Sequence, residues 1–393
     1  MWRAAISPNR LLPVLVAILG LWCDAGAQDQ GSLLGYRDAE RVRESRRYSD
    51  AAIAVRLGGA FVWPEDTDLD EGREFEANPS GSVFAHWKNV LEDFSIDAYL
   101  GPDGGLISLY QRDGLQSLTG RLDVSARPLS IYRDGFYRED EFVPVGAYEG
   151  LDFGVFLAAE QRLVENLMIS VGPFYRRYDF DDRVGGVPGF VRPGDFNAHG
   201  LRAVLQYVDR EPDRFHPAEI HDGVLASLQV DYESNDQRGP FGSPTFQSAL
   251  PGSTFRGSLL IEIVDRVSEE FASQIRIEGA LHERDDRIAT TDAQTPIGTA
   301  FVDGVFGLRY ANEQVAITPY ARVQFVRALD AFGQGSDDQA FFGGGIRGRW
   351  NLAKNLRLFF DASYLNNPGR PVVTWERGSL GEFQVVSGLE WTL

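Results

Sequence analysis

Apolar and polar residues alternate along most of this chain, from about residue 51 to its C-terminus. Ile275 and Ile277, for example, fall on one face of an extended segment, whereas Arg276 and Glu278 fall on the other. The same alternation is found at residues 52–63, 118–125, 151–163, 167–176, 201–207, 224–232, 255–263, 302–310, 317–325, 342–350 and 356–364. A period of two predicts β-strands that have one polar and one apolar face.

The connections between these runs alternate between short and long. Tight turns are expected at residues 164–166, 267–270, 312–314 and 352–355, and longer polar segments at 179–194, 234–252, 285–298, 330–339 and 366–381. Trp or Tyr often stands at the end of the apolar face, as in Trp350 and Trp391. These features predict an all-β fold, a transmembrane antiparallel up-and-down β-barrel of 12 to 16 strands with an even strand count, over residues 50–393. Eleven of the strands are expected from Leu151 onward. A soluble β-sandwich or propeller is the alternative, but it accounts less well for the aromatic residues.

The last predicted strand alternates up to the final residue. Phe383, Val385, Leu389 and Trp391 share one face with the terminal Leu393. This strand resembles the C-terminal targeting strand of bacterial outer-membrane barrels, which usually ends in Phe or Trp. Here the aromatic residue stands two positions before the end.

The N-terminus predicts export. Arg3 and Arg10 form a basic region, an apolar stretch follows, and residues 25–27 (Ala-Gly-Ala) form a cleavage site, so residues 1–27 are expected to be a cleaved signal peptide. The single cysteine, Cys23, follows Trp22 rather than the small residue that a lipoprotein signal would need. Residues 28–49 form a short charged periplasmic segment, either a helix or plug for the barrel or a solvated leader. The expected location is the outer membrane, reached through the periplasm.

Composition narrows the possible partners. The 57 acidic and 38 basic residues give a formal net charge of -19, which excludes nucleic acid as the main partner. No stretch after residue 27 has the roughly 18 consecutive apolar residues of a membrane helix. The expected partners are outer-membrane lipid, lipopolysaccharide and, during biogenesis, the barrel-assembly machinery. The sequence does not predict an oligomeric state.

The polar face of the strands carries charges of both signs. The residues expected to line the lumen are Arg256, Glu262, Arg276, Glu278, His282, Asp303, Arg309, Arg322, Arg347, Arg349, Arg357 and Asp361. In a narrow barrel such residues would pair and fill the interior, because an unpaired buried charge is costly. In a wide barrel they would line water and set selectivity.

Enzyme chemistry is not visible in the sequence. A lipid hydrolase of the outer membrane would need a His beside a Ser near one rim, and His199 has no Ser nearby on its own face. His216 and His221 could bind zinc with Glu219 or Asp222, but an ordinary polar loop explains them better. We therefore expect no catalytic residue, no metal site and no cofactor.

Two segments resemble a known family. Residues 205–210 lead through Pro217 and Gly223 to a strand, a loop and Phe255-Arg256-Gly257, and residues 342–347 form a late glycine-rich strand. This pattern resembles the barrel of the surface-antigen family of outer-membrane assembly factors. The chain departs from that family, because the lid-loop Arg-Gly-Tyr motif is absent and fewer than 30 residues lie between the predicted cleavage site and the first strand. Insertase or secretion activity is therefore not carried over.

The sequence leaves three functions open. The first is a non-enzymatic outer-membrane barrel, either a small-solute channel or a structural or surface barrel with a largely filled, charged lumen. The second is an outer-membrane hydrolase that modifies lipids. The third is a truncated assembly or secretion barrel, which an internal lid loop and a weak seam between the first and last strands would favour.

Overall fold

The alternating runs of the sequence form β-strands in the computed structural model. The structure describes residues 51–64, 76–91, 94–101, 104–111, 118–138, 141–186, 188–212, 220–244, 246–283, 298–329, 336–366 and 381–392. Within these ranges the alternation has a direct cause, because successive side chains of a strand point to opposite faces of the sheet. Among the described residues, none forms a helix that is long and apolar enough to cross a membrane.

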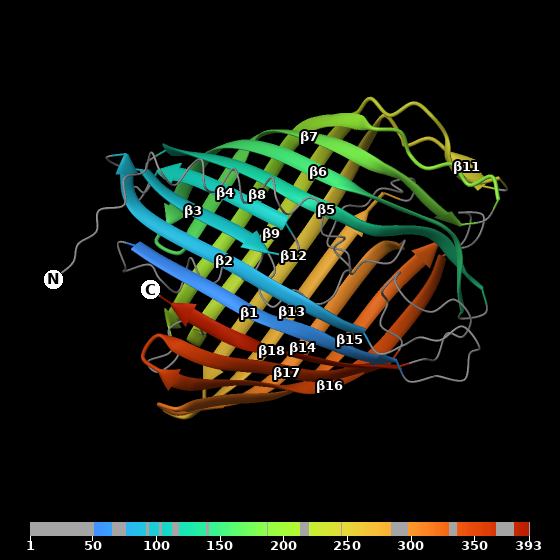
Figure 1. Cartoon of the computed structure of the whole chain (residues 1–393). Helices are drawn as coiled ribbons and strands as arrows, with labels where there is room; N and C mark the ends of the chain where they lie inside the picture. Colours follow the sequence, from blue (N-terminus) through green and yellow to red (C-terminus); the bar gives the residue numbers. More distant parts are fainter. Residues whose placement is uncertain are drawn as a thin grey trace.

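Sixteen of the strands close into one antiparallel barrel (Figure 1). They are β1 (Ala51–Pro64), β2 (Glu76–Leu91), β3 (Phe94–Gly101), β4 (Gly104–Gln111), β5 (Leu118–Arg138), β6 (Glu141–Val164), β7 (Leu167–Gly186), β8 (Phe196–Pro212), β9 (Ile220–Asn235), β12 (Ser253–Arg266), β13 (Phe271–His282), β14 (Gly298–Ala311), β15 (Val315–Leu329), β16 (Ser336–Ala353), β17 (Leu356–Asn366) and β18 (Gly381–Thr392). Each barrel strand pairs with the barrel strands that precede and follow it in the chain, so the topology is up-and-down. The predicted fold class and the even strand number are confirmed at the upper limit of the predicted range.

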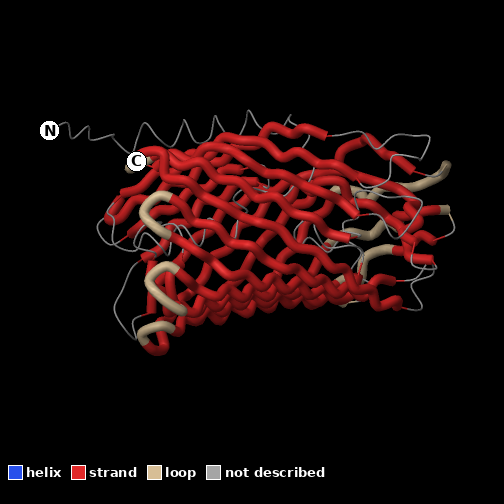
Figure 2. The backbone as a smooth tube through the Cα atoms, turned by 90° about the horizontal axis from the view of Figure 1, so that it is seen from below, coloured by secondary structure: helices blue, strands red, loops and turns tan. Residues whose placement is uncertain are grey.

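Two further strands lie outside the barrel sheet. β10 (Phe241–Ser243) and β11 (Phe246–Ser248) form a small hairpin in the connection between β9 and β12. Figure 1 shows this hairpin at one end of the barrel, whereas β18 ends at the opposite end. The expected turns at residues 164–166, 267–270 and 312–314 lie between consecutive strands. Short turns gather at the end of the barrel where the C-terminus lies (Figure 2).

The barrel is closed by β1 and β18, the first and last strands in the chain. Their pairing runs without interruption from Ala54 opposite Thr392 to Pro64 opposite Glu382. The backbones approach closely at Gly388, where a Cβ atom would lie 2.3 Å from the carbonyl oxygen of Leu57. We conclude that glycine is required at Gly388 for the seam to close.

Two segments that the sequence predicts as loops are partly strands. β7 continues to Gly186 and pairs with the start of β6, where Gly146 lies opposite Gly186. β16 begins at Ser336 and pairs with the end of β15. Both segments are polar in sequence, and polarity alone does not distinguish a strand in water from a loop. Residues 1–50, with the predicted signal peptide and charged segment, and the predicted loop at 285–297 lie outside the described residues.

Candidate functional site

The two faces of the barrel wall differ in chemistry. On β12, Arg256 and Glu262 are buried on the face that points into the barrel. Phe255, Leu259 and Ile263 lie on the opposite face and are exposed. The same contrast holds along other strands, so the barrel carries an apolar outer surface around a charged interior. The basic residues of the whole chain are almost all arginine, with lysine only at Lys88 and Lys354.

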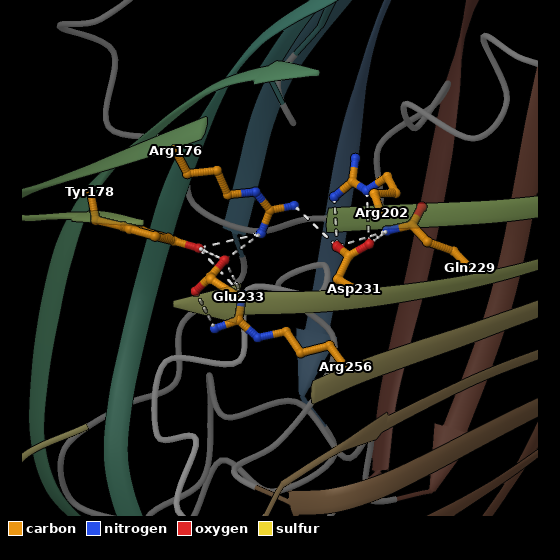
Figure 3. Close-up of polar contacts among 7 residues, drawn as sticks. All are labelled: Arg176, Tyr178, Arg202, Gln229, Asp231, Glu233 and Arg256. Carbon is orange, nitrogen blue, oxygen red and sulfur yellow. Dashed lines mark hydrogen bonds and ion pairs between the residues drawn. The ribbon is translucent and has the colours of Figure 1, made fainter. Parts of the chain in front are cut away.

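The most densely bonded part of the interior lies on the wall formed by β7, β8, β9 and β12. We call it the arginine cluster; its members are Arg176, Tyr178, Arg202, Gln229, Asp231, Glu233 and Arg256. Figure 3 shows the side chains of these residues pointing toward one another across the four strands. Two carboxylates from β9 organise the cluster, and each receives bonds from neighbouring strands.

The first of these carboxylates is Asp231. Arg202 donates to it through Nε at 2.9 Å and through Nη2 at 2.7 Å, the two-point geometry that makes an Arg–carboxylate pair strong. Gln229 donates from Nε2 to both carboxylate oxygens, at 3.2 and 3.1 Å. Arg176 lies further away, with Nη2 at 3.9 Å. The guanidinium of Arg202 also stacks over the Phe156 ring, 5.2 Å from its centroid.

The second carboxylate, Glu233, is almost completely buried, with 1% of its surface exposed. Arg256 lies 3.1 Å away through Nη2 and donates from Nη1 at 3.2 Å. The hydroxyl of Tyr178 donates to Glu233 at 3.3 Å, and Nη1 of Arg176 lies 3.7 Å away. Because a buried charge is stable only when it is paired and hydrogen-bonded, these contacts explain how Glu233 is tolerated inside the wall.

Tyr178 connects the arginine cluster to the rim of the barrel. Its ring stacks on Phe196 with a centroid distance of 4.5 Å. Both rings belong to an apolar cluster with Phe241 of β10 and Leu250. The connection that carries β10 is bonded to the loop before β8, because Val191 and Gly242 exchange two backbone hydrogen bonds of 2.9 and 2.8 Å.

At the rim, Asp236 is hydrogen-bonded to Asn197 near the start of β8. Asp236 accepts hydrogen bonds from the backbone nitrogen of Asn197 at 2.6 Å and from its side-chain amide at 3.0 Å. These two bonds lower the pKa of the Asp236 carboxyl below its usual value, because they favour the charged form. Asp236 therefore stabilises the start of this loop while it is ionised.

The seam between β1 and β18 also carries buried ion pairs. Nε of Arg56 donates to Glu390 at 2.6 Å, and Nη1 of Arg357 donates to the other carboxylate oxygen at 3.2 Å. The guanidinium of Arg56 lies over the Phe359 ring, 5.4 Å from its centroid. A carboxylate on the last strand is thus shared by arginines of the first strand and of β17, which adds charge pairing to the backbone hydrogen bonds of the seam.

The wall formed by β14 to β17 is more accessible to water. Arg322 donates through Nε and Nη2 to Asp303, at 2.9 and 3.0 Å. Arg347 donates to Asp361 at 3.0 Å, and the hydroxyl of Tyr320 donates to the other oxygen of Asp361 at 2.8 Å. The Arg347 side chain is nevertheless 43% exposed, compared with 6% for Arg256 in the arginine cluster. Water therefore reaches Arg347 more freely than the arginine cluster, although Arg309 and Arg357 on the same wall are buried.

A fourth polar group lies on β2 to β5. His86 and Asp97 are directly opposite each other, with Nδ1 of His86 2.5 Å from a carboxylate oxygen. Ser108 donates to Asp123 at 2.6 Å in the next pair of strands. His86 is fully buried, and its Nε2 atom has no hydrogen-bond partner among the described residues. In the part of the chain that the structure describes, no serine is hydrogen-bonded to the imidazole of this His–Asp pair.

The residues that the sequence predicts as lumen-lining fall into two sets. Arg256, Glu262, Asp303, Arg309 and Arg357 are buried, whereas Arg276, Glu278, Arg322, Arg347, Arg349 and Asp361 are partly exposed. The structure brings together several of them, such as Arg276 with Glu278, and Arg322 with Asp303. The side chain of His282 lies outside the described residues. That these residues line a passage stays a prediction.

Sequence reasoning missed part of the interior. Arg176, Tyr178 and Glu233 were not expected in the site, because their strands were predicted to end near these positions. Their inward orientation could have been inferred from the sequence, because residues two positions apart on a strand share a face. Tyr178 follows Arg176 by two positions, and Glu233 follows Asp231 by two. His86 was also missed, since only the pairing of β2 with β3 places it opposite Asp97.

The expectation that His199 has no nearby serine was wrong. The register places Ser234 of β9 directly opposite His199 of β8 on the outward face of the wall. Antiparallel pairing had not been considered, and it brings residues together that are distant in sequence. However, the Ser234 hydroxyl donates to the carbonyl oxygen of Gly252 at 3.1 Å, so a Ser–His hydrogen bond is not formed. His216 lies outside the described residues, and so does the side chain of His221.

The fold and the polarity of its faces define a transmembrane β-barrel of the bacterial outer-membrane class. Among solved structures, the chain is similar to BamA from Haemophilus ducreyi lacking POTRA domains 1–3, with a TM-score of 0.51 and 11% identity over 88% of this chain and 70% of that one. It also matches CdiB from Acinetobacter baumannii, with a TM-score of 0.46 and 11% identity over 88% of this chain and 60% of that one. A third match is OprB of Pseudomonas putida, with a TM-score of 0.44 and 11% identity over 88% of this chain and 94% of that one.

Only the first of these similarities is close enough to support the fold. It agrees, at the level of the barrel, with the sequence resemblance to the surface-antigen family. No family model matches the chain. No curated protein matches it either.

Proposed function

We propose that this protein is an outer-membrane channel for small hydrophilic solutes. The observation that carries the proposal is the partly exposed, charged wall inside a closed barrel of sixteen strands. Barrels with 16 to 18 strands are wide enough to leave an aqueous channel. Interior side chains that keep a large exposed fraction, such as Arg347, fit a water-filled passage along the β14–β17 wall.

The arginine cluster, which only β13 separates from the β14–β17 wall, would form a closed part of the barrel wall beside this passage. Its charges are paired and largely buried, as expected for a wall that is packed rather than wet. A barrel filled throughout would instead bury Arg347 and Asp361 to the same degree as Glu233. The proposed passage is therefore off-centre, next to the β14–β17 wall.

The outer surface supports a location in lipid. Its exposed side chains include Leu259, Phe325 and Ile346, and aromatic residues such as Trp350 and Trp391 lie near the turn end of their strands. This arrangement matches the apolar band and aromatic girdle of membrane barrels. We propose that this band contacts outer-membrane lipid and lipopolysaccharide and that the barrel-assembly machinery inserts the chain.

Two other functions fit less well. An assembly or secretion barrel was expected to have a weak seam, whereas β1 and β18 pair along their length and share the Arg56–Glu390 ion pair. A lipid hydrolase would need an oriented Ser–His pair, and the Ser234 hydroxyl is bonded elsewhere. A channel requires neither feature.

The test is the conductance of the refolded protein in planar lipid bilayers. We expect steady single-channel steps that scale with salt concentration. The double variant R347A/R322A, which removes two partly exposed arginines, should change the conductance, whereas R177A on the outward face of β7 should not. A protein that folds into a heat-modifiable barrel but gives no conductance would refute the proposal and favour a filled structural barrel.

A further inference from the structure

The wall from β14 through β18 to β1 carries an excess of positive charge, although the chain as a whole is strongly negative. Of the inward side chains that the structure describes on β14 to β18 and on β1, six are arginines: Arg56, Arg309, Arg322, Arg347, Arg349 and Arg357. The inward carboxylates described on the same strands are Asp303, Asp361 and Glu390. The arginine cluster is more evenly balanced, since Asp231 and Glu233 stand against its three arginines.

This unequal distribution bears on the solute. Fixed charges on the wall of a narrow aqueous passage act on passing ions more strongly than charges on the outer surface, because the low-dielectric wall focuses their field. The acidic residues responsible for the net charge of -19 lie largely elsewhere in the chain. A passing ion therefore meets the local excess of arginine and not the overall negative charge.

Arginine also restricts the chemistry of the solute. A guanidinium presents a planar set of donors that binds carboxylate and phosphate groups through two parallel hydrogen bonds. Arg322 already bonds Asp303 in this way, and the Arg347 guanidinium stays partly exposed beside the ring of Tyr320, 5.6 Å from its centroid. Arg347 is thus the most accessible of the paired arginines on this wall.

We propose that the passage prefers anions and that its solutes are small oxyanions carrying carboxylate or phosphate groups. This inference rests on the proposed channel function. Arg347 and Arg322 would attract and guide the anion along the β14–β17 wall. Asp303 and Asp361 would hold the two guanidinium groups in place, so that the anion exchanges between pre-arranged donors.

The experiment is the reversal potential of the refolded barrel in a gradient of potassium chloride at low ionic strength, where screening is weak. We expect the wild type to pass chloride in preference to potassium. R347Q should lower the anion-to-cation permeability ratio by about twofold to fivefold, because one charge is removed next to an aqueous path. D361N should raise the ratio, and this opposite sign cannot come from misfolding. R177Q, on the outward face, is the matched control and should leave the ratio unchanged.

Inorganic phosphate, added at constant ionic strength, tests the solute class. We expect it to reduce the chloride current in the wild type and to reduce it less in R347Q. Cation preference in a conducting wild-type channel, or a ratio that R347Q and D361N leave unchanged, overturns the anion preference while the channel function stands. A phosphate effect equal in both proteins overturns the oxyanion assignment. A folded barrel without conductance refutes the channel and this inference together.

Discussion

Replacing Glu233 by glutamine tests whether the arginine cluster stabilises the barrel as a charge network. The side chain is 1% exposed and faces Arg256 at 3.1 Å and Arg176 at 3.7 Å. Removing one partner of a buried ion pair costs about 3–5 kcal/mol, because the remaining charge stays buried without compensation. We expect E233Q near the lower end of that range, since the amide oxygen can still accept from Tyr178.

The assay is reversible unfolding in guanidinium chloride, with the barrel refolded into lipid vesicles and followed by tryptophan fluorescence. A double-mutant cycle with R256M separates charge compensation from packing, because the double variant removes both partners of the pair. We expect E233Q/R256M to be less destabilised than the sum of the single variants. A loss below about 1 kcal/mol in E233Q, or additive single effects, would refute the reasoning from the buried pair.

Three further predictions concern the seam, the lipid face and the rim. G388A should abolish barrel closure, detected as loss of heat-modifiable migration on a gel, whereas G257A has room for its Cβ and should fold. L259R on the outer face should cost about 2–4 kcal/mol in vesicle unfolding, whereas V267R at a turn should cost at most about 1 kcal/mol. The lowered pKa of Asp236 means that its stabilisation is present above the pKa of an unfolded Asp and is lost as pH falls through the folded value. Amide protection factors in the loop after β9 should therefore drop below about pH 4 in the wild type but stay constant with pH in D236N.

The alternation of the sequence predicted the fold well because a barrel strand is defined by its two faces. Each strand from β6 onward repeats a pattern such as that of Ile275 and Arg276, so its existence could be inferred without knowing its partners. The number of strands before Leu151 was harder to predict, since β3 and β4 have eight residues each and give only a short pattern. The observed five strands in that region complete the sixteen.

The interior contacts could not be predicted in the same way. Parity assigns Arg202 and Asp231 to the inward face, but only the register of β8 against β9 places them opposite each other. Register in turn depends on turn geometry and on the stagger of the whole barrel. The continuation of β7 to Gly186 was also hidden, because residues such as Asp179 and Asp181 are equally typical of strands in water and of loops.

The near absence of lysine in this chain determines the shape of the cations inside the barrel. A guanidinium is planar and presents its donors as a fixed fork, whereas a lysine ammonium is a compact point charge on a flexible stem. The described cations on the β14–β17 wall are all arginines, including Arg322 and Arg347, and their partners Asp303 and Asp361 are carboxylates. The ion pairs of this wall therefore have defined directions as well as charges. Replacing Arg322 by lysine would keep the positive charge but lose the two-point bond to Asp303.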